Sequence, residues 1–536
     1  MSKRIAIAAA ALCMGAAMVA AGASPAGAEP KRGGILKFVV PDEPPSFDGH
    51  KETTFALIHP IAPFYSVLIR VDPNNPASLT DYVCDLCTSM PSATDDGTSY
   101  TFKIRKDVKF HDGTKLSAKD VLATFQRIIF PPEGISSARK SQYPMVASVT
   151  APDDETVTFK LKYPSGAFIP SLANPYNFIY SKAKLDADPK WYENNVMGSG
   201  PFIFDTREAG ARVTGKRNPD YYHKGLPYLD GFEAIFAKKQ SLRVQAIRGD
   251  QAAIEFRSFP PKSRDDLVAA LGKDVTVQES NWNCGLTLTP NHSKKPFDDV
   301  RVRRALTLAL DRWGGSKDLS KIAIMKAVGG IVFPGHPLAL TDEELKSVAG
   351  YWPDIEKSRA EARRLLKEAG AENLEFTVLN RAVDQPYTIA GTWMIDQWKK
   401  VGIQAKQRGE STGGWFAALR NGDFEVAITA NCQSIVNPLL DVSTYLSSSK
   451  AAQQYGRFED PELEKLFNAM NSTDKVAEQK SYMDKLQKRV LDEEAHNFQV
   501  MWWYRIIPHR SYVKGWKITP SHYLNQDLSG VWIDKG

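Results

Sequence analysis

Residues 281–312 read NWNCGLTLTPNHSKKPFDDVRVRRALTLALDR and join an apolar strand to a strongly specified helix. Asp298 is expected to cap this helix, because its carboxylate can accept hydrogen bonds from the free amides of the first turn. Apolar residues then recur at helical spacing and predict one buried stripe, made of Val302, Ala305, Leu306, Ala309 and Leu310. Gly314 and Gly315 are expected to end the helix. This periodicity indicates a helix packed in a core and does not indicate any function.

Residues 1–28 have the pattern of a secretory signal peptide. Lys3 and Arg4 precede an Ala-rich apolar run at residues 5–23, and Ala-Gly-Ala at residues 26–28 forms a small-residue cleavage site. A retained membrane anchor is the alternative, because the run approaches the roughly 20 residues that span a bilayer. Alanine is only weakly apolar, so we expect cleavage and an exported, soluble mature protein.

Length and charge narrow the class. The chain of 536 residues is long enough for roughly three domain-sized units after cleavage. The formal net charge of +6 is small and evenly spread, which argues against a nucleic-acid partner. Past the signal peptide, the sequence contains no apolar run long enough to cross a membrane.

Four cysteines remain after cleavage, namely Cys84, Cys87, Cys284 and Cys432. An even number in an oxidising compartment favours disulfides, and three pairings are possible. We expect Cys84 to pair with Cys87 and Cys284 to pair with Cys432. The Cys-x-x-Cys spacing also fits a redox motif or half of a zinc site, but no second pair of this spacing completes one.

The first strand, at residues 34–41, leads into a proline-rich loop that contains Glu43 and Phe47. Loops at strand ends often supply ligand contacts, so both side chains are candidates, and an ordinary proline turn is the alternative for each. Further on, an Asp-Gly turn, a β-prone run at residues 100–104 and a helix opening near Ser117 follow one another.

This last region carries a family resemblance. Residues 95–128, DDGTSYTFKIRKDVKFHDGTKLSAKDVLATFQRI, resemble the hallmark segment of the family 5 bacterial extracellular solute-binding proteins, the peptide, nickel and opine receptors of ABC importers. The resemblance extends along nearly the whole mature chain. Its further segments are GSGPF at residues 198–202, RNPDYY at 217–222, PFDDVRVRRALTLALDR at 296–312 and SRAEARRLLKEAG at 358–370.

The resemblance implies an α/β fold of two lobes joined by a hinge, with mixed β-sheets flanked by helices and a small subdomain inserted in the first lobe. It divides the chain into a signal peptide at 1–28, lobe I at 29–55, 196–283 and 501–536, the inserted subdomain at 56–195, and lobe II at 284–500. Within lobe II, helices and strands alternate from residue 355 to residue 430, which predicts a largely parallel sheet.

The ligand is expected in the cleft between the lobes. In peptide-binding relatives an Asp after the strand at residues 425–430 takes the ligand's amino terminus, but the matching position here is Ser434. Asn431, Gln433 and Ser434 remain candidate contacts. Arg381 resembles the position where dipeptide-binding relatives hold a carboxylate, and its planar donors suit two oxygens. The sequence therefore keeps a candidate anion site and lacks the cation site.

Aromatic residues are further candidates for the cleft. Trp282, Trp415 and Trp503 offer large contact areas for stacking on a ligand. Core packing is the alternative and is expected for at least half of the tryptophans here, because alternation on a strand puts Trp502 and Trp503 on opposite faces.

Enzyme motifs are missing. Residues 210–217, GARVTGKR, lack the Ser or Thr and the following helix of a phosphate-binding loop, so a hairpin is expected. The nine histidines form no HExxH, and no G-x-S-x-G is present. No metal or cofactor is expected.

The resemblance implies a periplasmic, monomeric receptor that captures a peptide-like or other small anionic or neutral solute and delivers it to the transmembrane subunits of an ABC permease. A sugar oligomer, an opine or a chelated metal is an alternative ligand. An exported hydrolase, or a folding helper or adhesin, is an alternative class.

Overall fold

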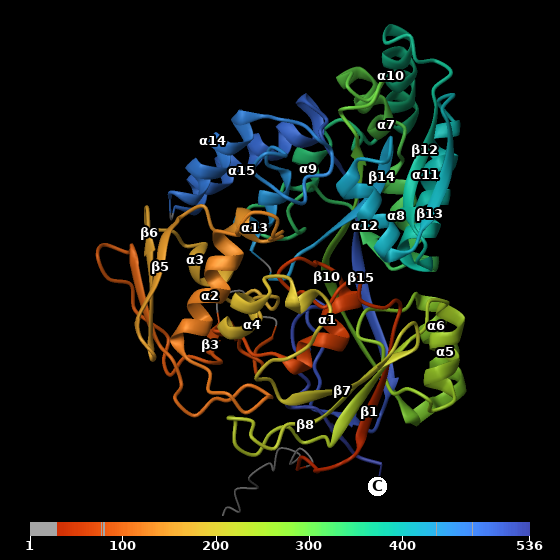
Figure 1. Ribbon diagram of the computed structural model, residues 1–536. Helices are drawn as coiled ribbons and strands as arrows, with labels where there is room; N and C mark the ends of the chain where they lie inside the picture. The colour runs from red at the N-terminus through yellow and green to blue at the C-terminus, as the bar shows by residue number, and fades with distance from the viewer. Residues whose placement is uncertain (1–28, 77, 79–80, 436, 474, 536) are drawn as a thin grey trace, which may run out of the picture.

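The computed structural model describes residues 29–76, 78, 81–435, 437–473 and 475–535. The expected signal peptide, residues 1–28, lies outside the described residues. Within those ranges, none of the helices combines the length and the apolar character that crossing a bilayer requires. The chain forms two lobes, one in the lower and one in the upper half of Figure 1, with a further unit beside the lower lobe.

Lobe I is built on a four-stranded sheet in the order β1-β9-β8-β7. Its strands are β1 (Ile35–Val40), β7 (Phe202–Glu208), β8 (Arg212–Arg217) and β9 (Gly231–Phe236). β1 runs parallel to β9, and β8 is antiparallel to both of its neighbours. β7 and β8 form the hairpin predicted at residues 210–217. The helices are α1 (Phe55–Ile61), α5 (Gln240–Arg248) and α6 (Pro261–Leu271), and the C-terminal tail returns to this core through β16 (Val513–Lys514) and β17 (Trp532–Ile533).

The inserted subdomain has a separate apolar core beneath an antiparallel sheet of β4, β6 and β5. These strands are β4 (Ser99–Lys103), β5 (Val146–Asp153) and β6 (Thr156–Leu161), with α2 (Ala118–Ile129) packed on them and α3 (Phe168–Leu172) and α4 (Lys182–Ala187) following. Ser117 and Asp120 form a capping box that starts α2. The Cys84–Cys87 disulfide follows the small ladder of β2 (Ile69–Val71) and β3 (Tyr82–Cys84).

A six-stranded sheet in the order β11-β15-β10-β14-β12-β13 forms lobe II and continues downwards. Its strands are β10 (Val275–Pro290), β11 (Met325–Ala327), β12 (Glu375–Arg381), β13 (Gln404–Glu410), β14 (Val426–Cys432) and β15 (Phe498–Arg510). Only β14, β12 and β13 pair in parallel; the other pairs are antiparallel. The prediction of parallel pairing is therefore confirmed for the strands of the alternating segment and wrong for the six-stranded sheet as a whole. The reason is that β10 and β15 carry the chain into and out of lobe II in opposite directions.

The predicted alternation in lobe II is confirmed, because α10 (Ile355–Glu368), α11 (Ile389–Lys399) and α12 (Thr412–Asn421) each precede a strand. The helix at the start of lobe II differs from its prediction. Asp299, not Asp298, caps α7 (Val300–Leu308) by accepting a hydrogen bond from the Arg301 amide at 2.8 Å. The chain then restarts as α8 (Arg312–Ile322), whose first turn contains Gly314 and Gly315 because Asp311 provides a new cap.

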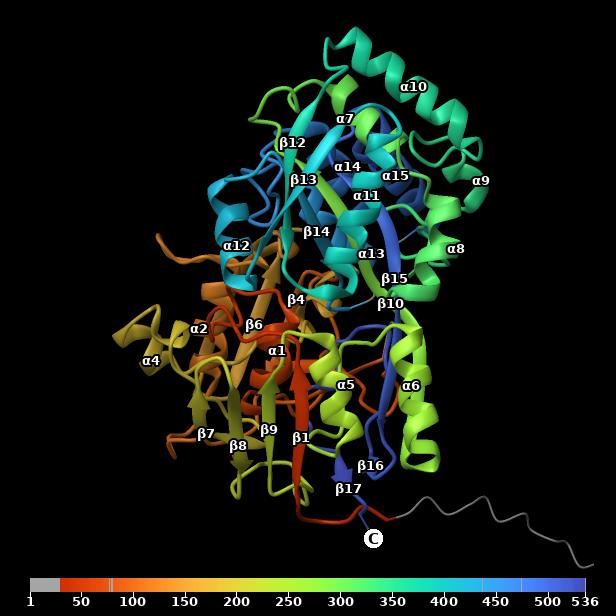
Figure 2. The ribbon, with the colours of Figure 1, turned by 90° about the vertical axis from the view of Figure 1, so that its right-hand side faces the viewer.

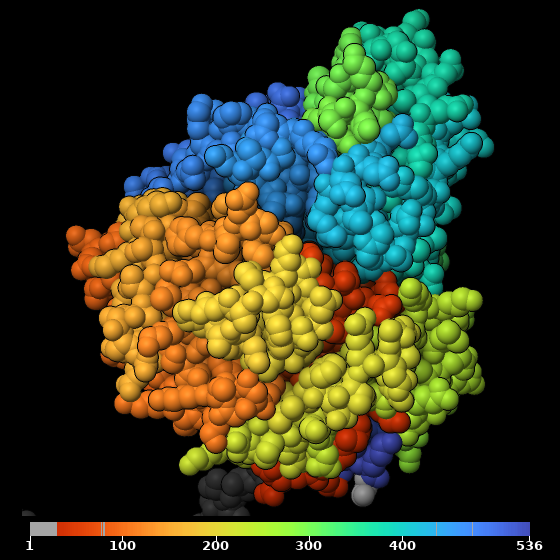
Figure 3. Space-filling model, viewed as in Figure 1, coloured from red at the N-terminus to blue at the C-terminus, as the bar shows by residue number. Residues whose placement is uncertain are grey.

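A second, mainly helical part of lobe II has its own core. It contains α9 (Asp342–Leu345), α13 (Pro438–Asp441), α14 (Pro461–Asn471) and α15 (Val476–Lys488). In the space-filling view the blue segment of this part, which contains α13, α14 and α15, rests on the orange inserted subdomain (Figure 3). The Gln453 side chain donates to the Ala138 carbonyl at 2.9 Å across this contact.

β10 and β15 are the strands that join the lobes, as Figure 2 shows. Their ladder is irregular where the lobes meet: Asn281 pairs with Tyr504 and Gly285 with Trp502, so three residues of β10 face Trp503 alone. Cys284 is the last residue of this bulge; it lies opposite Cys432 of β14, and the two form the expected disulfide. Residues 281–312 therefore contain the crossing point between the lobes.

Candidate ligand-binding site between the lobes

A cavity of about 70 Å³ lies between the lobes. Its walls come from the loop before α1, from β12, α12 and β14 of lobe II, and from β15. The lining residues are Thr53, Thr54, Phe55, Arg381, Tyr387, Trp415, Phe416, Thr429, Ala430, Asn431, Cys432, Gln453, Tyr455, Trp503 and Tyr523. Arg381 is the one charged residue among them. A neighbouring cavity of about 50 Å³ has no charged lining residue and shares five residues with the first, namely Thr429, Ala430, Asn431, Gln453 and Tyr455.

Arg381 is buried at the end of β12. Its Nε donates to the Thr412 hydroxyl at 2.9 Å, and its Nη2 donates to the Thr54 hydroxyl of lobe I at 3.1 Å. The guanidinium also lies 4.5 Å from the centre of the Phe55 ring. These acceptors are neutral, so a buried positive charge faces the cavity without a carboxylate among its hydrogen-bond partners. A ligand anion would supply the missing charge.

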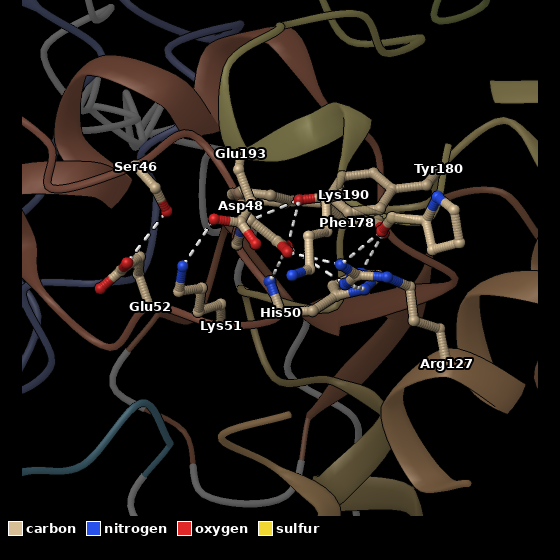
Figure 4. A network of polar contacts seen from close by, with 12 residues as sticks. Ser46, Asp48, His50, Lys51, Glu52, Arg127, Phe178, Tyr180, Lys190 and Glu193 are labelled. Carbon is tan, nitrogen blue, oxygen red and sulfur yellow. Dashed lines mark hydrogen bonds and ion pairs between the residues drawn. The ribbon is translucent and has the colours of Figure 1, made fainter. Parts of the chain in front are cut away.

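The loop that carries Thr53 and Thr54 is held by a buried polar network (Figure 4). Asp48 accepts a hydrogen bond from Arg127 Nη2 of the inserted subdomain at 2.6 Å. Arg127 Nη1 lies 3.1 Å from His50 Nδ1, and His50 Nε2 lies 2.9 Å from the Phe178 carbonyl. Because Nδ1 accepts from arginine, the ring proton sits on Nε2 and is donated to the carbonyl.

The charges of this network follow from burial and from Arg127. Burial lowers the pKa of His50 to about 3, with Arg127 acting in the same direction, so the imidazole is neutral. Burial alone would raise the pKa of Asp48, but Arg127 and His50 outweigh it and hold that pKa below its usual value. A fixed ion pair therefore anchors the lobe I side of the cavity.

Aromatic rings form most of the remaining wall. Tyr387 and Trp503 meet edge to face with ring centres 5.9 Å apart, and Tyr387 meets Trp415 in the same way at 6.3 Å. Among the described residues, Trp415 Nε1, Trp503 Nε1 and Asn431 Nδ2 are buried without a hydrogen-bond partner. All three are N–H donors, so the wall offers donors to a ligand rich in acceptors.

Hydrogen bonds between the lobes hold this closed arrangement. The Thr412 hydroxyl donates to Asp42 in the loop after β1. Asp384 of lobe II accepts from the Gln240 amide at the start of α5, at 3.1 Å. Each bond joins residues that a hinge opening would separate.

The structure brings Arg381, Trp415, Asn431 and Trp503 of the predicted residues to the cavity, and leaves the others outside its lining. Trp282 packs at the hinge, where its indole N–H donates to His522 Nδ1 at 2.9 Å. Gln433 is buried beside Asn283, whose carbonyl accepts from the Gln433 amide.

Ser434 contacts the C-terminal tail, because its backbone carbonyl accepts a hydrogen bond from the Ser521 hydroxyl at 3.0 Å.

The two candidates in the loop after β1 contact other parts of lobe I. Glu43 accepts a hydrogen bond from the Gly210 amide of the β7–β8 turn at 3.0 Å. Phe47 is buried, with the Arg207 guanidinium 4.9 Å from its ring centre. Both loop candidates thus serve lobe I itself.

Several cavity residues escaped the sequence prediction: Thr53, Thr54, Tyr387, Gln453, Tyr455 and Tyr523. A local signal existed only for Thr54, which precedes an apolar helix and accepts from the Ala56 amide at its N-terminus. Tyr523 reaches the site from the C-terminal tail, where its hydroxyl donates to the Thr53 carbonyl at 3.2 Å.

A further cavity of about 70 Å³ lies within lobe I and the inserted subdomain, on the other side of Tyr523. Its charges are already paired, since Arg70 donates to Asp527 at 2.6 Å and Asp85 accepts from Tyr222 at 2.9 Å. The cavity between the lobes, with its unpaired guanidinium, is therefore the better candidate.

Two lobes closed by a hinge over a cavity lined by aromatic rings and N–H donors define a ligand-binding receptor fold. The chain belongs to family 5 of the bacterial extracellular solute-binding proteins, because the model of that family's middle region matches residues 81–453.

Curated relatives agree with this membership. Di/tripeptide-binding protein 1 of Pseudomonas aeruginosa UCBPP-PA14 is 29% identical over 364 residues, which cover 62% of this chain and 64% of the relative. Glutathione-binding protein GsiB of Escherichia coli O157:H7 is 30% identical over 293 residues, which cover 54% of this chain and 53% of the relative. The chain is thus matched over between about half and two thirds of the length of these relatives.

Solved structures share the fold. The periplasmic binding protein AgaA of A. tumefaciens R10, in complex with agropinic acid, superposes with a TM-score of 0.83 at 22% identity over 94% of this chain and 99% of that chain. The oligopeptide-binding protein AppA of Bacillus subtilis, in complex with a nonapeptide, gives 0.81 at 22% identity over 95% and 100%. Identity at this level shows a common fold and leaves the ligand open.

Proposed function

We propose that this protein is a periplasmic receptor that captures a small peptide-like or other anionic solute between its lobes and delivers it to an ABC permease. The observation that carries the proposal is the buried Arg381 guanidinium, which faces an interlobe cavity with only hydroxyl partners. Family membership supports the receptor role and the permease partner.

The ligand takes its carboxylate end to Arg381 and its remaining acceptors to the indole and amide donors of the wall. The cavity of about 70 Å³ is far below the roughly 300–1,000 Å³ of small-molecule pockets, so the lobes lie further apart than in this structure both when the ligand enters and when they have closed on it. Binding then selects the closed form, because only closure brings donors from both lobes to the ligand.

The proposed lobe boundaries follow the hinge. The irregular pairing at Trp282, Asn283 and Cys284 supports a change of lobe near residues 283–284. On β15, the register shifts of the same ladder fall between Gln499 and Tyr504, which supports a return of the chain to lobe I near residue 501. The start of the inserted subdomain is better placed at residue 68 than at residue 56, because α1 packs in the lobe I core and the subdomain core begins at Leu68.

Export to the periplasm through cleavage after residue 28, and action as a monomer, belong to the same proposal. Sizing of the secreted protein by mass and by light scattering tests both at once. The expected product begins at Glu29 and has the mass of one chain.

X-ray scattering in solution tests the receptor role. The protein is measured with its co-purified solute, after that solute has been removed by denaturation and refolding, and again after it has been returned. The expected result is a larger radius of gyration without the solute and a return to the compact value with it. One unchanged lobe arrangement in all three samples would count against a hinged receptor.

The alternatives predict different results. An exported hydrolase would convert the released solute, so mass spectrometry after long incubation should then show products. A folding helper or adhesin would show no rise in melting temperature with any small solute, whereas a receptor is stabilised by mass action.

A further inference from the structure

A second arginine lies beside the cavity, and the function proposed above does not use it. Arg257 follows the segment that pairs with β1 in lobe I, and its side chain is fully buried. Its Nη1 donates across the lobe boundary to the Gln385 carbonyl at 2.6 Å. Its Nε and Nη2 have no hydrogen-bond partner among the described residues.

The surroundings of Arg257 are the rings of the cavity wall. Its guanidinium lies 4.6 Å from the centre of Phe55, 5.3 Å from Trp503 and 5.9 Å from Tyr387. Arg381 lies 4.5 Å from the same Phe55 ring. The two guanidinium groups therefore contact one ring that lines the cavity, one from each lobe.

Charge around this pair is not balanced. The charge of Glu255, two residues before Arg257, favours the protonated form of Arg257, but the hydrogen bond of this carboxylate goes to Arg243 at 2.7 Å. Arg505 is a third buried arginine next to this pair. It donates hydrogen bonds to the backbone carbonyls of Phe256, Arg257 and Thr519. Burial lowers the pKa of Arg257 to about 10, and the charge of Arg381 acts in the same direction, yet the group stays protonated at neutral pH.

We propose that Arg257 and Arg381 form a two-part anion site, and that the ligand carries two carboxylates, one for each guanidinium. Arg257 has two free donors in a planar fork, which is the geometry that a carboxylate accepts. Among the described residues, neither guanidinium donates a hydrogen bond to a carboxylate, so the ligand would supply those acceptors. This inference rests on the proposed receptor function and names its ligand class.

Opening of the lobes gives the ligand access to Arg257. When lobe II swings away, Arg257 loses the Gln385 carbonyl and its donors face the widened cleft. A carboxylate that binds there neutralises the charge before closure buries it. The second carboxylate meets Arg381 as the lobes close.

Two probes that differ by one carboxylate test the inference: N-acetyl-glutamate carries two and N-acetyl-glutamine carries one. Calorimetry on solute-free protein compares the wild type with Arg257→Gln, Arg257→Lys and the control Arg248→Gln, an exposed arginine on α5. The wild type and the control are expected to bind the diacid about 10- to 100-fold more tightly than the amide. Arg257→Gln is expected to bind both equally.

Arg257→Lys keeps the charge without the fork, so an intermediate preference is expected, and this variant serves if Arg257→Gln does not fold. Equal binding of both probes by the wild type, or an unchanged preference in Arg257→Gln, would overturn the inference. Failure of both probes to bind would also overturn the diacid class. The receptor function is decided separately, because closure with the co-purified solute does not depend on these probes.

Discussion

Arg381 is a buried charge whose surroundings fit the proposed anionic ligand. Its guanidinium donates hydrogen bonds to the hydroxyls of Thr412 and Thr54. These bonds fix the orientation of the planar group, but neither acceptor carries a negative charge. Isolated buried charges are unfavourable, so a purely structural role would favour an acidic partner. The absence of one from its hydrogen bonds is the residue-level argument for an anionic ligand.

Arg381→Ala is predicted to weaken ligand binding by about 10- to 100-fold, since charge-assisted hydrogen bonds contribute about 1.5–3 kcal/mol. Titration calorimetry with the co-purified solute measures the effect. Arg363→Ala, at an exposed position on α10, is the matched control and should bind like the wild type. Unchanged affinity in Arg381→Ala would remove this residue from the site.

Buried histidines predict a dependence of stability on pH. Burial lowers the pKa of both His50 and His59 to about 3, whereas an unfolded chain titrates near 6.5. Their contribution to stability is fully present above about pH 6.5 and is lost progressively down to about pH 3, because the unfolded state takes up protons that the folded state does not.

Urea unfolding should therefore give a lower free energy of unfolding at pH 5 than at pH 7, by about 2 kcal/mol for each such histidine. His59→Gln should reduce this difference by about the share of one histidine. An equal free energy at both pH values, or the same difference in the variant, would contradict the assignment of a buried neutral His59.

At the scale of elements, β10 and β15 act as the hinge because their ladder is interrupted where the lobes meet. The Cys284–Cys432 disulfide ties the upper edge of that interruption to β14, next to Asn431 at the cavity. The interruption is short, and the disulfide fixes the end of β14, which carries Asn431, to it.

Replacing Cys284 and Cys432 by alanine is predicted to lower the free energy of unfolding by about 2–4 kcal/mol and to weaken ligand binding. The two cysteines are separated by 148 residues, so their bond restricts the unfolded chain strongly. The double alanine variant of Cys84 and Cys87, separated by 3 residues, is the control with smaller effects on both. Full ligand affinity in the variant that lacks Cys284 and Cys432 would contradict the proposal that this disulfide positions the end of β14 at the cavity.

The first turn of α12 joins the lobes through Thr412, which accepts from Arg381 and donates to Asp42. Thr412→Val keeps the shape and removes both bonds, so we expect ligand affinity to fall by about 5- to 30-fold. Thr392→Val, on the exposed side of α11, should leave affinity unchanged. Equal affinities in the two variants would show that this contact does not stabilise the closed form.

At the scale of the whole molecule, the motif-rich segments made the fold predictable. The helix pattern after residue 296 and the alternation beyond residue 355 depend on local spacing, and both appear in the structure. The direction of the strands in lobe II was not predictable in this way. β10 and β15 pair across more than two hundred residues, and no local pattern records that pairing.

The candidate site was predictable only in part, for a similar reason. Arg381 and Asn431 lie at strand ends, where a motif or a resemblance can place them. Thr53 and Tyr523 come from opposite ends of the chain and meet through the fold alone. Glu43 and Ser434 looked equally suitable in the sequence, but each is engaged by a neighbouring turn or tail segment.

Mass spectrometry of the purified protein under native conditions is the decisive test of a receptor for an anionic solute. We expect one small solute bound to each chain, released intact by denaturation and carrying at least one carboxylate for Arg381. Release of peptides with free amino termini would contradict the loss of the cation site at Ser434. A solute without any acidic group would contradict the role assigned to the guanidinium in the cavity.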